Sequence, residues 1–125
     1  MNGDNMSDKI TKDVRFFVRM ASRIILNETN MPAEDVEIVK KYLIAVKNLL
    51  SAVEGEPNFA NARNLVGLYL PDKYQLYGMS IIDVIERYIS SLHIDFSENQ
   101  ELVIDLIEAA IDGAIDTVNE IAVIG

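Results

Sequence analysis

The stretch VEIVKKYLIAVKNLLSAV, residues 36–53, determines the fold class of this chain. Its apolar side chains recur at alternating steps of three and four residues, the spacing of one face of an amphipathic helix. They are Val36, Val39, Leu43, Val46, Leu50 and Val53. Pro32 precedes the pattern at a position that suits the first turn of a helix, and Gly55 and Pro57 end it. The stretch therefore predicts a long helix with one buried face.

Four further segments show helical spacing on either side of this stretch, and no segment alternates with the period of two typical of strands. They cover about residues 8–26, 58–70, 80–92 and 97–121. Ser7, Ser80 and Ser97 can each cap the helix that follows. Pro71 ends the third helix, and residues 71–79 read as a loop or a single turn.

We therefore predict an all-α, single-domain bundle of about five helices, three long and two short. Residues 1–7 are predicted to form a flexible N-terminal tail and residues 8–125 the helical domain. A domain of this size can bury a core without disulfides or metals.

Composition narrows the classes of function. The chain has no cysteine and one histidine, which leaves little room for a zinc site, a thiolate nucleophile or histidine-based acid–base chemistry. The N-terminus lacks the basic and apolar segments of a signal peptide, and the longest apolar run is too short to span a bilayer. We expect a cytoplasmic, non-enzymatic protein that binds no cofactor, metal or membrane.

The net charge of −9 belongs to the last third of the chain. Residues 1–82 carry ten acids and ten bases, whereas residues 83–125 carry ten acids and a single base, Arg87. Because nucleic acid and anionic lipid would be repelled by this part, we do not expect it to bind free nucleic acid.

The acids of the last predicted helix follow one another at steps of three or four residues on one side of it. The candidate partner-binding acids are Glu101, Asp105, Glu108, Asp112, Asp116 and Glu120. Repulsion between successive acids costs about 1–3 kcal/mol in all, and salt reduces it. The face serves either solubility or the docking of a basic partner protein.

Gly113 lies in the middle of the same predicted helix, beside Ala109, Ala110 and Ala114. Because glycine costs about 1 kcal/mol relative to alanine inside a helix, we expect a packing reason for it. Small side chains let another helix approach closely. We predict that this helix is the first or second of the same chain.

Tyr74 and Tyr77 are a second candidate contact. If exposed, they resemble the aromatic anchors of protein interfaces. In the alternative interpretation they fold back over the core and contribute only to its packing.

Two further hypotheses come from other classes of protein. Carboxylate pairs at Glu34/Glu37, Asp83/Glu86 and Asp105/Glu108 resemble those of the Mg²⁺-dependent all-α nucleotide pyrophosphatases, although these pairs are predicted to face outwards.

A basic stripe of Lys12, Arg15, Arg19 and Arg23 is also predicted to face outwards, so that it cannot pair extensively with the acids of the last helix in one bundle. Pairing between molecules would give salt-sensitive self-association, including a homodimer.

The sequence thus favours a small acidic interaction module, such as an adaptor, an inhibitor or a regulatory subunit. It would dock a basic partner protein through the acidic face of its last helix.

Overall fold

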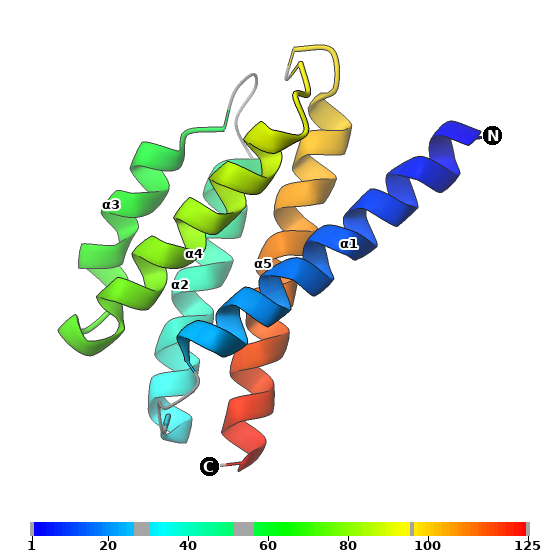
Figure 1. The fold of residues 1–125 in the computed structure, drawn as a ribbon. Helices are drawn as coiled ribbons and strands as arrows, with labels where there is room; N and C mark the ends of the chain where they lie inside the picture. Colours follow the sequence, from blue (N-terminus) through cyan, green and yellow to red (C-terminus); the bar gives the residue numbers. More distant parts are fainter. Residues whose placement is uncertain (1, 27–30, 52–56, 96, 125) are drawn as a thin grey trace.

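The computed structural model describes residues 2–26, 31–51, 57–95 and 97–124, and within these ranges the chain forms five α-helices (Figure 1). They are α1 (Asn2–Ile25), α2 (Ala33–Ser51), α3 (Phe59–Tyr69), α4 (Asp72–Ser91) and α5 (Gln100–Ile124). The all-α bundle predicted from the sequence is confirmed.

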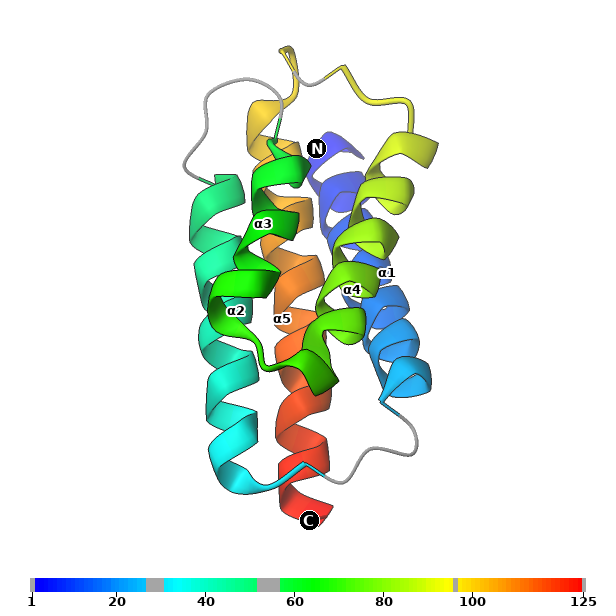
Figure 2. The same cartoon turned by 90° about the vertical axis from the view of Figure 1, so that its left-hand side faces the viewer.

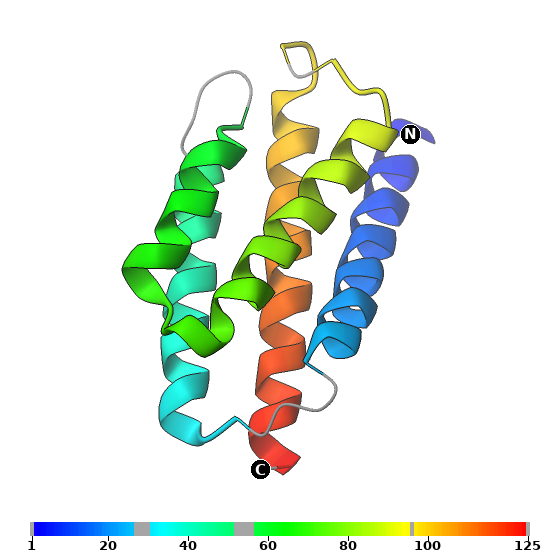
Figure 3. The ribbon, with the colours of Figure 1, turned by 60° about the vertical axis from the view of Figure 1, so that its left-hand side comes forward.

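The helices alternate in direction along the chain, so that the first and the last run parallel to each other (Figure 2). Helix α5 lies between α1 and α2 and contacts both, while α3 and α4 lie across one side of this layer (Figure 3). Helix α4 also contacts α1 and α5, and α3 contacts α2 and α4. This arrangement places the first and last helices side by side, with the two chain termini at opposite ends of the bundle (Figure 2).

The core is built mainly from α2, α4 and α5. Five of the six seam residues predicted for α2 are buried, namely Val36, Val39, Leu43, Val46 and Leu50, whereas Val53 lies outside the described residues. In α5 the apolar residues with the same spacing, Val103, Ile107, Ile111, Ala114 and Val118, are buried as well, and Ile121 is partly buried. The three- and four-residue spacing therefore identified the inner faces of both helices correctly.

Helix α4 begins eight residues before the predicted Ser80 and has 20 residues, so the prediction of a loop over residues 71–79 was wrong. Pro71 occupies the N-cap position, where its missing N–H costs no hydrogen bond. Gly78 lies inside this helix, where a Cβ would lie 2.7 Å from Leu70 Cδ1 and 3.1 Å from Val66 Cγ2. Glycine eases the close packing here, although both neighbouring atoms are the ends of side chains that can shift.

The other helix ends also differ in part from the predictions. Helix α1 includes residues 2–7, which we predicted as part of a flexible tail. This segment holds no proline, and its one glycine weakens a helix without breaking it. Ser97 does not cap α5, since its backbone N–H and its hydroxyl both bond to Asp95 Oδ1, at 3.0 and 2.7 Å. No helix in the described ranges is long and apolar enough to cross a membrane.

Candidate functional site

The acids in the second half of α5 are paired with basic residues of neighbouring helices. Arg15 donates to both carboxylate oxygens of Asp116, at 2.9 and 3.2 Å. Arg19 donates to one oxygen of Glu120 at 2.6 Å, and Arg23 donates to its other oxygen. On the opposite flank, Lys47 Nζ of α2 lies 3.0 Å from Asp112 Oδ1.

Close packing of α1 on α5 explains how these pairs form. A Cβ at Gly113 would lie only 2.5 Å from the Arg15 carbonyl oxygen, so the two backbones touch at this residue. One turn later, the Thr117 hydroxyl donates to the Arg19 carbonyl oxygen at 3.1 Å. The prediction that Gly113 admits α1 or α2 is confirmed for α1. Because the helices are so close, arginines on the edge of α1 reach the acids on the edge of α5.

The prediction that the basic stripe and the acidic face cannot pair within one bundle was therefore wrong. Arg15 and Asp116 are 101 residues apart, as are Arg19 and Glu120, because a four-residue repeat on one helix runs alongside a four-residue repeat on a parallel neighbour. Arg19 and Arg23 pair with Glu120 near the C-terminal end of α5, where cations interact favourably with the helix dipole. Self-association through these two stripes loses its basis.

The acids in the first half of α5 stay unpaired among the described residues. Glu101 and Asp105 are exposed and Glu108 is half-buried, and the ion pairs found in the described ranges include none of the three. We call these three residues the unpaired acidic face. It is the part of the predicted docking surface that still carries uncompensated charge.

Tyr74 and Tyr77 are 2 % and 3 % exposed, so they cannot be surface anchors. The Tyr74 hydroxyl donates to Asp35 Oδ2 at 2.6 Å, and the Tyr77 hydroxyl lies 2.7 Å from the Ser22 hydroxyl. Burial, with the Asp35 hydrogen bond next, raises the pKa of Tyr74, and burial raises the pKa of Tyr77. The two side chains fasten α4 to α2 and α1.

The carboxylate pairs proposed as magnesium ligands do not converge. Arg63 of α3 donates to Asp83 at 2.7 Å and also to Glu86. In the described part of the chain, no three acidic or histidine side chains gather as metal ligands would. The pairing with Arg63 gives Asp83 and Glu86 a structural role between α3 and α4.

Helix α1 carries an apolar surface that was not predicted. Phe17 and Ile24 share the three- and four-residue spacing that predicts an inner face, yet both are exposed. Four large side chains of this helix point away from the core: Phe16, Phe17, Met20 and Ile24 are 62 %, 46 %, 49 % and 71 % exposed. We call them the outer α1 face. Their signal is present in the sequence, since Phe16, Met20 and Ile24 repeat every four residues on the side of the helix opposite Val14 and Val18.

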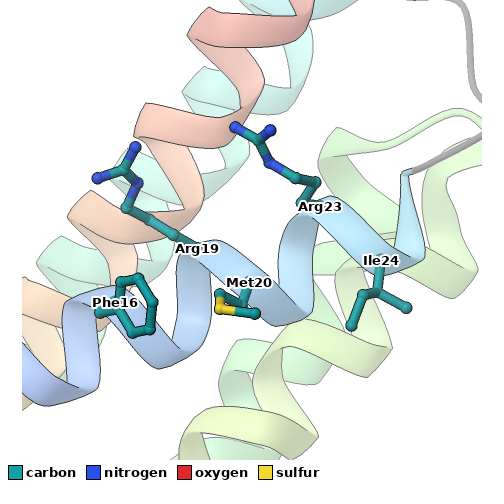
Figure 4. Close-up of a pocket in the computed structure, with 5 residues that line it drawn as sticks. All are labelled: Phe16, Arg19, Met20, Arg23 and Ile24. Carbon is teal, nitrogen blue, oxygen red and sulfur yellow. The ribbon is translucent and has the colours of Figure 1, made fainter.

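A shallow depression of about 330 Å³ runs along this face (Figure 4). Its apolar wall consists of Phe16, Met20 and Ile24, and its other wall consists of Arg19 and Arg23, which point towards α5. At the edge nearest α4, Phe17 packs on Tyr88 with ring centroids 5.3 Å apart.

A second group of exposed apolar side chains lies around the end of α3 and the start of α4. Leu68, Tyr69, Leu76 and Met79 are 78 %, 44 %, 76 % and 38 % exposed. They lie around Tyr74 and Tyr77 in the sequence, the two residues predicted as a contact, which are themselves buried.

No protein-family model, no curated protein and no solved structure matches this chain. A function for this protein is therefore inferred from the surfaces described above.

Proposed function

We propose that this protein is a non-enzymatic interaction module, such as an adaptor, an inhibitor or a regulatory subunit, that binds another protein through the outer α1 face. The observation that carries the proposal is the exposure of four large apolar side chains on consecutive turns of one helix. Contiguous exposed apolar surface is typical of protein contact sites. Phenylalanine and methionine are also among the residue types enriched in interfaces.

The unpaired acidic face supports a secondary role in the same function. Glu101, Asp105 and Glu108 carry three negative charges that form no ion pair among the described residues. Charges at the rim of an interface mainly raise the rate of association and select the partner. We propose that these acids attract a basic region of the partner, while apolar contact on α1 supplies most of the affinity.

A pull-down from native lysate tests the proposal with two matched double variants. Met20→Gln/Ile24→Gln removes one methionine and one branched aliphatic side chain from the outer α1 face. Leu76→Gln/Met79→Gln removes the same two kinds of side chain from α4, with similar exposure. Glutamine forms helices well and adds no charge, so both variants should fold, as circular dichroism would verify.

We expect a partner that the wild type and the α4 variant retain and the α1 variant loses. Retention by both variants would contradict the proposal. Loss from the α4 variant alone would move the contact to the surface around the end of α3 and the start of α4.

A further inference from the structure

The outer α1 face has the form of a helix-docking groove. The side chains at positions 16, 20 and 24 make one ridge along the i, i+4 direction, and the arginines at 15, 19 and 23 make the next ridge. The depression between them has one apolar and one guanidinium wall (Figure 4). A ridge of side chains on another helix fits such a groove by ridges-into-grooves packing.

The charge of this wall differs in sign from that of the molecule as a whole. Helix α1 carries five bases and three acids, whereas α5 carries six acids and no base. Arg19 and Arg23 share one carboxylate, that of Glu120, so the wall keeps one positive charge in excess. The Arg23 side chain is 65 % exposed, so its guanidinium can donate to a further carboxylate.

We infer that the occupant of this groove is an amphipathic helix of a partner protein with an apolar i, i+4 ridge flanked by carboxylates. This inference rests on the proposed function and specifies the chemistry of its partner. The apolar ridge would pack between Phe16, Met20 and Ile24, and the flanking carboxylates would pair with Arg23 and Arg19. A second copy of the chain in a symmetric contact would offer the same cationic wall instead of carboxylates.

Two synthetic helical peptides test the inference. Both carry leucines at every fourth position, and they differ only in the flanking residues, which are glutamate in one peptide and lysine in the other. Fluorescence anisotropy with the full-length protein measures their affinities, and amide chemical shifts locate the site. Wild type, Met20→Gln/Ile24→Gln and Arg23→Gln are compared at low and at high salt.

We expect the glutamate peptide to bind about tenfold more tightly than the lysine peptide, since its carboxylates pair with Arg19 and Arg23, whereas lysines are repelled by them. Shifts should concentrate between Phe16 and Ile24. The Met20→Gln/Ile24→Gln variant should lose binding of both peptides. Arg23→Gln should reduce the preference severalfold, and salt should reduce it in the wild type.

Equal binding of the two peptides, tighter binding of the lysine peptide, or no binding of either would overturn the inference. The inference would also be overturned if light scattering showed that the wild type is a dimer and the Met20→Gln/Ile24→Gln variant a monomer, because a second copy would then cover the face. If the full-length protein bound vesicles of phosphatidylglycerol and phosphatidylcholine through α1 and did not bind the peptides, the occupant of the groove would be a lipid surface instead. These results leave the proposed function to its own test, which depends on the native partner and not on the charge of its flanks.

Discussion

Gly113 determines how closely the first and last helices of this protein approach each other. At this residue the α1 backbone lies where a side chain would otherwise be, with the Arg15 carbonyl oxygen 2.5 Å from an ideal Cβ position. A backbone atom cannot rotate away as the end of a flexible side chain can. The contact therefore requires glycine, and the ion pairs of α1 with α5 depend on it.

Replacing Gly113 should test this contact. We expect Gly113→Ala to lower the free energy of unfolding by about 1–3 kcal/mol, because the clash outweighs the better helix propensity of alanine. Gly67→Ala is the control, since nothing lies within 4 Å of a Cβ at that helical position. It should raise stability by about 0.5–1 kcal/mol. Urea denaturation measures both, and a gain in both variants would contradict the close approach.

Asp35 illustrates how a buried carboxylate is kept charged. It is 9 % exposed, and the hydrogen bond from Tyr74, followed by the bond and charge of Lys73 at 2.9 Å, holds its pKa below the ordinary value. A lowered pKa in the folded state means that ionised Asp35 stabilises the fold above the unfolded-state pKa. This contribution disappears as pH falls through the lowered pKa.

Removing the Tyr74 hydroxyl should reduce this dependence on pH. We expect Tyr74→Phe to destabilise the protein at pH 7 and to lose less stability than the wild type as pH falls below about 4. Tyr69→Phe is the control, because Tyr69 is 44 % exposed on α3. Urea denaturation between neutral and acidic pH measures the difference, and parallel curves for the wild type and Tyr74→Phe would argue against the role of the hydrogen bond.

At the scale of single elements, the end of α4 is held by a residue in an unfavourable conformation. His93 follows the C-cap Leu92 and has a φ of 53°, in the left-handed region that favours glycine. Its backbone N–H bonds to the Ser90 carbonyl oxygen at 3.2 Å, which closes the helix. The residue serves the chain reversal that leads towards α5.

Glycine at this position should stabilise the protein. We expect His93→Gly to raise the free energy of unfolding by about 0.5–1 kcal/mol, because it relieves the left-handed strain at the cost of a more flexible unfolded chain. His93→Ala should give no such gain, since alanine is strained in the same way. Thermal and urea denaturation of the three proteins measure the effect, and equal stability of the two variants would contradict the explanation.

At the scale of the whole molecule, the parallel packing of α1 and α5 divides one acidic stripe into two parts with different roles. Asp112, Asp116 and Glu120 hold neighbouring helices through basic partners, whereas the unpaired acidic face faces solvent. The relatively basic α1 thus lies beside the most acidic helix, and its apolar outer face remains open on the side away from the core.

Neutralising each part of the stripe should give opposite results. We expect Asp112→Asn/Asp116→Asn/Glu120→Gln to lower stability by about 1–2 kcal/mol at low salt, a modest value because these pairs are partly exposed. Asp105→Asn/Glu108→Gln should leave stability unchanged or raise it by a few tenths of a kcal/mol, since it removes repulsion. Glu101 is kept in this variant because it lies in the first turn of α5, where a negative charge favours the helix. Urea denaturation at two salt concentrations measures both. Equal destabilisation by the two variants would show that the unpaired acidic face also has structural partners.

The helical class of this protein and most of its buried faces were determined by the sequence alone. The spacing of apolar residues in α2 and α5 fixes which side of each helix avoids water, whatever the helix packs against. The need of Gly113 for a close neighbour was likewise predictable, because a glycine in a helix interior carries a cost that packing has to offset.

The tertiary structure alone decided which surfaces remain available. Periodicity gives the direction of a side chain around its own helix but not the rotation of one helix relative to another, so it could not show that the arginines of α1 reach the acids of α5. Local signals also misplaced the start of α4, because Pro71 fits equally as the end of one helix and the beginning of the next. That longer helix buried Tyr74 and Tyr77, and the packing of α1 on α5 and α4 left Phe16, Met20 and Ile24 exposed.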